Sequence, residues 1–366
     1  MQSTGDLHVY KTLTIQSHKG PYHVSFQENI SLDTLTDDIL QKSHVIIDKT
    51  VAEIYKNKLS QIQNAQSVLY IEATEQNKSL EQFPQYISHL VSNKIRRNHQ
   101  LIAIGGGIIQ DITCFLAATL LRGVNWWFIP TTLLAQADSC IGSKSSINCA
   151  GAKNILGTFT PPNKILIYTE FLQTLGVHEL HSGIGEMIKV HAINGAEALN
   201  KISLDYDNLF TNQYTLLQYL KRSLEIKKDI IEQDEFDQHI RNIMNYGHTF
   251  GHAIEAATQY AIPHGIAVTI GMDMANYLAS KYDSNKQTFY KQMHPILKRN
   301  YQAFSKHTIP FDIFLNAISK DKKNEGKNSI SAILPDELGQ IRKIKLDNND
   351  IFQQYCSDYL LQGREQ

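Results

Sequence analysis

The sequence lacks the features that mark secreted and membrane-spanning proteins. Its 366 residues include only four cysteines, at positions 114, 140, 149 and 356, and no two of them form a CxxC pair. A disulfide framework and a structural zinc site are therefore not indicated. No apolar run approaches the ~20 residues that span a bilayer, and the polar segment Met1–Lys11 has no apolar core of the kind that a secretory signal needs. We expect a cytoplasmic protein without a membrane partner.

A surplus of positive charge is missing as well. Lysine and arginine number 35 against 36 acidic residues, which gives a net charge of -1. A polyanionic partner normally leaves a basic surplus, so we expect no nucleic-acid partner. A small anionic ligand needs only a local cluster of cations, which a balanced total can hide.

Length and composition are those of a globular protein with two domains. Hydrophobic residues make up 42% of the chain and charged residues 19%. A chain of 366 residues is long for a single core.

Strand-like and helix-like segments alternate in the first half of the chain. Short apolar runs at Val45–Ile47, Val68–Ile71, Leu101–Ile104 and Trp126–Pro130 predict buried strands, and the Ala-rich segment Ile108–Leu121 predicts a helix. Strand, glycine turn, helix and strand form the βαβ unit of a parallel sheet that carries helices on its faces.

From about Leu180 the strand signals fade and helical periodicity takes over. We predict helices over residues 182–193, 214–232, 239–258 and 264–280. The sequence thus predicts an α/β domain over residues 1–178 and a mainly helical domain over residues 179–366. No internal repeat or low-complexity tract occurs.

A glycine loop follows the third predicted strand. Gly105–Gly107 ends that strand and opens a helix, where backbone N–H groups and the helix dipole can hold a pyrophosphate. The match to GxGxxG is incomplete because Gln110 stands where the third glycine would be. Taken alone, the loop supports a Rossmann-like dinucleotide site and a plain tight turn about equally. Thr131 and Thr132, after the next strand, can add hydroxyls at the same sheet edge.

A set of histidines in the second half has metal-ligand spacing. His248 and His252 lie at i and i+4 on one helix face, His264 follows at the start of the next helix, and Glu186 lies in an earlier one. Two His and one carboxylate leave a zinc ion an open position for a substrate hydroxyl or water. A metalloprotease would carry Glu directly after the first His, where Thr249 stands, so peptidase chemistry is not indicated. The sequence holds 15 histidines, and an isolated pair is usually structural or exposed.

Several cations fall in or beside these segments: Arg122, Lys144, Lys153, Lys189, Lys227 and Arg241. Most lysines are simply solvated. A phosphorylated, carboxylated sugar needs several cations, however, because an unpaired anion in a closed site is unfavourable. The shared neighbourhood with His and Glu favours a functional role.

Five motifs in one order carry a family resemblance: Arg122–Val124, Pro130–Ser139, Lys153–Asn154, Gly185–Lys189, and Gly247–Ala256 with His264–Gly265 downstream. From roughly Ile47 to Pro335 the chain resembles the 3-dehydroquinate synthases, within the sugar phosphate cyclases. The resemblance implies a homodimeric lyase of the shikimate pathway, and so of aromatic amino acid biosynthesis, that depends on NAD and on Zn²⁺ or Co²⁺.

The resemblance also implies roles for individual residues. Glu186, His248 and His264 correspond to the metal ligands, and His252 to a histidine that either supports a ligand from outside or acts in catalysis. The implied NAD contacts are Asp48, Glu75, Lys78, Gly106, Gly107, Ile108, Asp111, Thr131, Thr132, Asp138, Lys153, Phe171, Thr174, Leu175 and Glu179. The implied substrate and catalytic residues are Arg122, Lys144, Lys153, Asn154, Lys189, Lys227, Arg241, Asn245, His252, and Lys322 or Lys323 or both.

The chain departs from the family pattern at five places: Thr74, Gln110, Ser143, Cys149–Ala152 and Phe236. None of these changes removes a side chain with a direct chemical role. Those at 74, 110 and 143 could alter cofactor affinity or loop geometry.

The implied reaction converts 3-deoxy-D-arabino-heptulosonate 7-phosphate into 3-dehydroquinate and phosphate by transient oxidation with NAD, phosphate elimination and intramolecular aldol closure. Lys227, Arg241 and Asn245 favour this branch, because cyclases whose substrates have no carboxylate tend to differ there. The alternatives are a cyclase for sedoheptulose 7-phosphate, glucose 6-phosphate or an aminated sugar, a metal-dependent glycerol or alcohol dehydrogenase, and a non-enzymatic relative.

Overall fold

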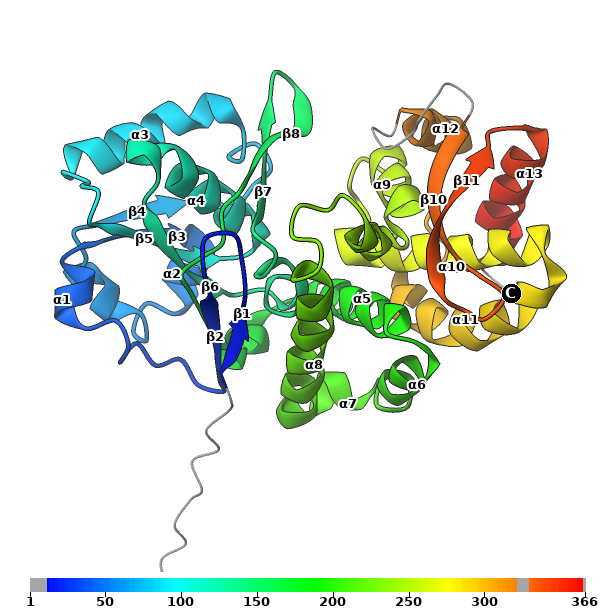
Figure 1. Cartoon of the computed structure of the whole chain (residues 1–366), viewed down its shortest axis with the longest axis horizontal. Coiled ribbons are helices and arrows are strands. Elements are labelled where there is room, and N and C mark those ends of the chain that lie inside the picture. The colour runs from blue at the N-terminus through cyan, green and yellow to red at the C-terminus, as the bar shows by residue number, and fades with distance from the viewer. Residues whose placement is uncertain (1–11, 321–328, 365–366) are drawn as a thin grey trace, which may run out of the picture. The chain divides into compact units, whose positions relative to one another are not determined.

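The computed structural model describes residues 12–320 and 329–364 (Figure 1). The chain divides into two compact units between Leu175 and Gly176. The sequence placed this boundary a few residues later, after residue 178. Unit 1 is an α/β domain and unit 2 is mainly helical, so the predicted fold class is confirmed.

Unit 1 is built on a seven-stranded sheet with the order β1-β2-β9-β6-β5-β3-β4. All neighbouring strands run parallel except β1 and β2, which are antiparallel. The strands are β1 (Leu13–Ile15), β2 (Tyr22–Gln27), β3 (Ser43–Asp48), β4 (Ser67–Ile71), β5 (Gln100–Gly105), β6 (Asn125–Pro130) and β9 (Lys164–Tyr168). The four predicted strands are present as β3, β4, β5 and β6, whereas β1, β2 and β9 were not predicted.

The central strands contain continuous apolar runs because both faces of the sheet are covered. Val45 and Ile47 of β3 pack with Ile102 and Ile104 of β5 in one hydrophobic core. Alternation along a strand turns the residues between them, such as Ile46, to the other face. The helices of unit 1 are α1 (Asp37–Leu40), α2 (Lys49–Ile54), α3 (Phe83–Ser92) and α4 (Gly107–Thr119). Helix α4 packs on β3, β5 and β6.

A β-hairpin stands apart from the seven strands (Figure 1). It consists of β7 (Lys144–Cys149) and β8 (Ala152–Phe159), which pair antiparallel and pack on α4. The hairpin was not predicted. It carries three of the predicted site residues, Lys144, Lys153 and Asn154.

Unit 2 combines helices with one two-stranded ribbon. The helices are α5 (Val177–Ile193), α6 (Ala196–Leu204), α7 (Asn208–Thr211), α8 (Gln213–Ile231), α9 (His248–Ala257), α10 (His264–Tyr282), α11 (Gln287–Tyr301), α12 (Phe311–Ser319) and α13 (Asp350–Asp358). The ribbon is formed by β10 (Ser329–Pro335) and β11 (Ile341–Asp347).

The predicted continuous helix over residues 239–258 is wrong. The segment Ile240–Asn245 forms a short 3₁₀ helix, η6, and α9 begins only at His248. Between them Gly247 has φ 78°, a left-handed conformation that an α-helix does not contain. The break turns the chain so that His248 becomes the first residue of a new helix.

Helix α10 is the centre of unit 2. Every residue from Gly265 to Ser280 is buried, and the helix packs against α5, α9 and α11. A helix that is surrounded on all sides has little need of a polar face, which explains its largely apolar sequence. No helix within residues 12–320 and 329–364 is both long and apolar enough to cross a membrane.

Candidate active site

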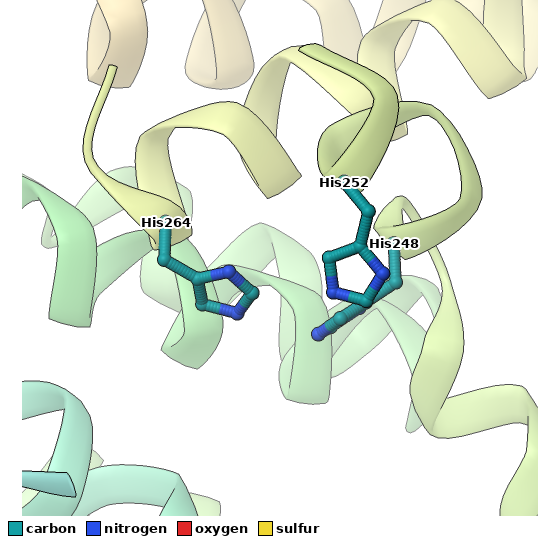
Figure 2. Close-up of side chains that lie close together, drawn as sticks. All are labelled: His248, His252 and His264. Carbon is teal, nitrogen blue, oxygen red and sulfur yellow. The ribbon is translucent and has the colours of Figure 1, made fainter. Parts of the chain in front are cut away.

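Three helices of unit 2 bring Glu186, His248 and His264 together. Glu186 lies in α5, and the two histidines are the first residues of α9 and α10. Glu186 Oε1 is 3.7 Å from His248 Nε2 and 3.5 Å from His264 Nε2. Figure 2 shows the rings of His248, His252 and His264 turned toward one another, and each ring offers a nitrogen within 4.8 Å of the others.

The Glu186 carboxylate fits a metal ligand rather than an ordinary buried acid. The side chain is 1% exposed, and Lys189 Nζ contacts Oε2 as an ion pair. Among the described residues no donor is aligned to hydrogen-bond either oxygen. A buried carboxylate is unfavourable unless cations or donors surround it. Two ligands of a tetrahedral zinc ion, bound at 2.0–2.1 Å, lie about 3.3–3.4 Å apart, close to both separations from Glu186 Oε1.

Both imidazoles have an acceptor at Nδ1. His248 Nδ1 lies 3.3 Å from the Tyr246 carbonyl, and His264 Nδ1 lies 3.1 Å from Glu255 Oε2. A neutral imidazole that donates from Nδ1 keeps the lone pair on Nε2, the nitrogen that faces Glu186. Burial by itself lowers the pKa of His264, but the Glu255 hydrogen bond and the charges of Glu255 and Glu186 outweigh it and raise that pKa.

Small residues let α5 and α10 approach closely where the two ligands lie. A Cβ on Gly265 would be 1.9 Å from the Ser182 carbonyl oxygen, and one on Gly185 would be 2.4 Å from the Gly265 carbonyl oxygen. The Ser182 hydroxyl also accepts a hydrogen bond of 2.9 Å from the Gly265 N–H. Because Gly185 precedes Glu186 and Gly265 follows His264, this close crossing sets the distance between the two ligands.

A second glycine crossing joins α9 to α10. A Cβ on Gly271 would lie 2.1 Å from the Gly247 carbonyl oxygen and 2.7 Å from the Gly251 nitrogen. Gly247 and Gly251 flank His248, so this contact fixes the third ligand relative to α10. The glycines of the GHTFGH and HG motifs thus act through backbone packing, while the histidines carry the chemistry.

Three buried cations lie on neighbouring elements of unit 2, and one of them, Lys189, contacts Glu186. Lys189, Lys227 and Arg241 are 2%, 6% and 5% exposed, and they lie on α5, α8 and η6. These three elements pack against one another through a small apolar cluster that includes Val190, next to Lys189, and Ile226, next to Lys227. The arrangement suits an anionic ligand, because a buried cation is stabilised by a charge of opposite sign. Asn245 ends η6 in the same region.

The predicted glycine loop of unit 1 lies at the carboxyl edge of the parallel sheet. Helix α4 starts at Gly107 with Gly106 as its N-cap, and a Cβ on Gly106 would come within 2.9 Å of Thr132 Cγ2. Thr131 N donates to the Gly105 carbonyl at 3.0 Å. From β3 the chain continues to β4, on one side of β3 in the sheet, whereas from β5 it continues to β6 in the opposite direction, so the strand order reverses between β3 and β5. Such a switch point is where open α/β sheets bind ligands, and Asp48 ends β3 there.

Lys78 links several of the predicted contacts of unit 1. Its Nζ lies 3.2 Å from Asp111 Oδ2, 3.0 Å from Asn154 Oδ1 and 3.4 Å from Glu75 Oε1. Burial raises the pKa of Asp111 to about 6, although the Lys78 charge opposes this. The hairpin therefore places Asn154, a predicted substrate residue, beside the predicted cofactor residues.

The remaining predicted residues are distributed as follows. Phe171 is buried in the core, where its ring makes an edge-to-face contact with the Tyr55 ring, so its side chain is not available to a ligand. Thr174 Oγ1 hydrogen-bonds the Tyr55 hydroxyl at 2.9 Å. Lys322 and Lys323 lie outside the described residues. The other predicted positions keep solvent access: Arg122, Lys144, Lys153 and Glu179 are exposed, and Ile108, Asp138 and Leu175 are half-buried.

Two departures from the family pattern have visible structural consequences. Gln110 and Ser139 exchange two hydrogen bonds of 2.6 Å, which join α4 to the π-helical turn η4 (Ala135–Ser139) that carries Asp138. Ser143 has φ 67°, in the left-handed region that favours glycine, so its backbone is strained.

Two contacts at the metal-site histidines were missed from the sequence: the Tyr246 carbonyl and Glu255. A signal for Glu255 existed, since it follows His248 and His252 on the same helical stripe at i+7.

Family models match this chain in two adjoining segments. The model described as 3-dehydroquinate synthase N-terminal matches residues 68–182, and the one described as 3-dehydroquinate synthase C-terminal matches residues 183–324. The 3-dehydroquinate synthase of Clostridium tetani is 35% identical over 311 residues, which cover 84% of this chain and 83% of that protein. The chain belongs to the 3-dehydroquinate synthase family. The enzyme of that name from Dictyoglomus turgidum is 33% identical over 344 residues, covering 93% and 96%.

Solved structures share the fold of this 3-dehydroquinate synthase family member. A 2-deoxy-scyllo-inosose synthase superposes with a TM-score of 0.79 at 19% identity, covering 95% of this chain and 99% of that one. The 2-epi-5-epi-valiolone synthase of Streptomyces hygroscopicus, solved with NAD⁺ and Zn²⁺ bound, also reaches 0.79 at 24% identity, covering 93% and 96%. A glycerol dehydrogenase from Schizosaccharomyces pombe reaches 0.57 at 15% identity, covering 97% and 93%. The fold is thus shared by cyclases and, less closely, by a dehydrogenase.

Proposed function

We propose that this chain is a 3-dehydroquinate synthase, which converts 3-deoxy-D-arabino-heptulosonate 7-phosphate into 3-dehydroquinate and phosphate in the shikimate pathway. The observation that carries the proposal is the identity of 33–35% to enzymes of that name over more than four fifths of each protein. Each unit supplies part of what this chemistry requires: unit 2 has a metal-fitting triad and buried cations for an anionic substrate, and unit 1 has a glycine loop for a dinucleotide.

In unit 2 the proposed metal ligands are Glu186, His248 and His264. The buried Glu186 carboxylate, with its separations of 3.5 Å and 3.7 Å from two imidazole nitrogens, supports the assignment. A bound Zn²⁺ or Co²⁺ ion supplies Lewis acidity that favours ionisation of a substrate hydroxyl. His252, whose ring centroid is 5.2 Å from that of His248, is the proposed proton-transfer group.

The buried cations of unit 2 are the proposed carboxylate site. Lys189, Lys227 and Arg241 bind the substrate carboxylate and adjacent oxygens through charge-assisted hydrogen bonds, while Asn245 orients a hydroxyl. Their burial supports this role, since a cation that is at most 6% exposed interacts strongly with an anion. A sugar phosphate that has no carboxylate would not make these contacts.

In unit 1 the proposed NAD contacts are the residues at the carboxyl edge of the sheet and the Lys78 cluster. Bound NAD supplies a hydride acceptor that is regenerated within each turnover. The N–H groups of Gly107 and Ile108, in the first turn of α4, hold the pyrophosphate, and Lys78 keeps Glu75 and Asp111 in place for the rest of the cofactor. Arg122, Lys144, Lys153 and Asn154 are the proposed contacts of the substrate phosphate.

We further propose that the enzyme works as a homodimer in the cytoplasm. The family resemblance supports the dimer. The four cysteines are free thiols, three of them buried, as expected for a protein of a reducing compartment.

The test is phosphate release from a panel of sugar phosphates. The enzyme is supplied with Zn²⁺ and a trace of NAD, and given the heptulosonate 7-phosphate, sedoheptulose 7-phosphate or glucose 6-phosphate. We expect rapid phosphate release from the first alone, many turnovers per NAD, and no net NADH at 340 nm.

Two results would contradict the proposal. Release from a sugar without a carboxylate would assign the chain to another cyclase, and NADH formed in proportion to product would assign it to a dehydrogenase. Chelator-treated enzyme serves as the control for metal dependence.

A further inference from the structure

Glu255 lies on the same stripe of α9 as the histidines. Positions 248, 252 and 255 are spaced i, i+4 and i+7, so their side chains share one helix face. The Glu255 side chain is 11% exposed, and its Oε2 lies 3.1 Å from His264 Nδ1. A carboxylate that is nearly buried is held where it makes a specific contact, because full solvation is not available to it.

The contact determines which nitrogen of His264 faces the metal position. Because a carboxylate only accepts hydrogen bonds, the Nδ1 atom must carry the proton. The lone pair of the neutral ring is then on Nε2, which lies 3.5 Å from Glu186 Oε1. The opposite tautomer would turn an N–H toward the metal position and prevent coordination there.

His264 needs such a partner more than the other two ligands do. Its side chain is 36% exposed, against 14% for His248 and 1% for Glu186. Packing therefore holds its ring least, and a hydrogen bond must fix the rotation. His248 has a weaker arrangement of the same kind, a neutral carbonyl at 3.3 Å.

We propose that Glu255 is a positioning residue that fixes the tautomer and orientation of His264 and strengthens metal binding through its charge. The inference rests on the proposed metal site. Carboxylate–histidine–metal arrangements commonly change metal affinity by 10–100-fold when the outer carboxylate is lost. Two separable contributions are expected. The acceptor atom sets the tautomer, and the negative charge raises the basicity of Nε2.

Two substitutions separate these contributions. Glu255→Gln keeps an acceptor of the same shape and removes the charge, whereas Glu255→Leu removes both. The control is Glu197→Gln on α6. Glu197 forms an ion pair with Lys201 at the surface, and its side chain is 84% exposed. For each full-length variant, the dissociation constant of Co²⁺ is measured by competition with a chromophoric chelator, together with the visible Co²⁺ spectrum and the ¹⁵N shifts of the His264 ring in metal-free protein.

We expect Co²⁺ binding about 10-fold weaker in Glu255→Gln and about 100-fold weaker in Glu255→Leu, with no change in the control. The ¹⁵N shifts are expected to report an Nδ1–H tautomer in wild type and Glu255→Gln, and a mixture in Glu255→Leu. If Glu255 only stabilised the fold, a variant that unfolds at the wild-type temperature would show an unchanged His264 tautomer and an unchanged Co²⁺ spectrum.

The outcomes distinguish the two levels of the proposal. Wild-type affinity and an unchanged tautomer in both Glu255 variants would overturn the positioning role, while the metal site itself stood. Failure of the wild-type protein to bind Co²⁺ would instead overturn the metal site on which the inference rests. If Glu255→Leu does not fold, the affinity of the isosteric Glu255→Gln still decides the question.

Discussion

The close crossing of α5 and α10 predicts a large effect of Gly265→Ala on metal binding. This change alters none of the proposed ligand residues themselves. The new Cβ would lie 1.9 Å from the Ser182 carbonyl oxygen, whereas real contacts are essentially never below 3.0 Å. The backbones must therefore separate by about 1.1 Å, which extends the Glu186–His264 distance from 3.5 Å to about 4.6 Å if the shift lies along it. Two ligands at 2.0–2.1 Å can be at most about 4.2 Å apart, so they could no longer share one zinc ion.

We expect Gly265→Ala to bind Zn²⁺ or Co²⁺ at least 100-fold more weakly and to lose about 1–3 kcal/mol of folding stability through overpacking. Chelator competition measures the first and thermal unfolding followed by circular dichroism the second. Gly176→Ala, at the start of α5, is the control because a Cβ there would meet no described atom within 4 Å apart from its neighbours along the chain. A Gly265→Ala protein that folds and binds metal as tightly as this control would refute the argument from the crossing.

Three further changes test other parts of the molecule. Burial and two neighbouring histidines lower the pKa of His44 to about 4, so unit 1 should lose up to about 3 kcal/mol as the pH falls from 6.5 toward 4. In His44→Asn the free energy of unfolding, measured by urea unfolding followed by tryptophan fluorescence, should depend less on pH over this range. The same pH dependence as in the wild type would contradict the prediction. Gln110→Ala removes the hydrogen bonds to Ser139 and should weaken NAD binding several-fold, as measured by calorimetry. The control is Gln100→Ala, at the amino end of β5, which should leave NAD binding unchanged. Equal effects of the two changes would count against a role of the Gln110–Ser139 contact in NAD binding. Arg241→Ala should weaken binding of the keto-acid 10–100-fold and leave NAD binding unchanged, with the exposed Arg222→Ala as control; equal loss of both ligands would exclude a carboxylate role.

The sequence predicted the elements whose signal is local. The apolar runs of β3 to β6 and the glycine turn before α4 are visible over a few residues, because a parallel sheet that is covered on both sides demands continuous apolar strands. Strand β9, Lys164–Tyr168, has an apolar run like those of β3 to β6 and was overlooked. The β7–β8 hairpin escaped because its strands are largely polar and β8 contains a glycine, so neither strand has a continuous apolar run. The break at Gly247 was missed for a similar reason, because a single glycine is compatible with a continuous helix until α10 packs against it.

The candidate site divides in the same way. Histidine spacing and family resemblance pointed to Glu186, His248 and His264, yet only the crossing of three helices explains why the Glu186 oxygen lies between two ring nitrogens. The strain at Ser143 and the Gln110–Ser139 link likewise depend on backbone angles and on tertiary contacts. Spacing within one helix showed which residues share a face of that helix. It did not show which residues of other helices contact that face.

The central claim is that one carboxylate and two imidazoles, Glu186, His248 and His264, hold a divalent ion, while His252 does not. The most direct test is Co²⁺ stoichiometry and affinity, with the visible spectrum, in Glu186→Gln, His248→Ala, His264→Ala and His252→Ala. We predict a loss of at least 100-fold in the first three and near-normal binding in His252→Ala. Full binding in Glu186→Gln, together with loss in His252→Ala, would instead identify the three imidazoles as the ligands and contradict the assignment.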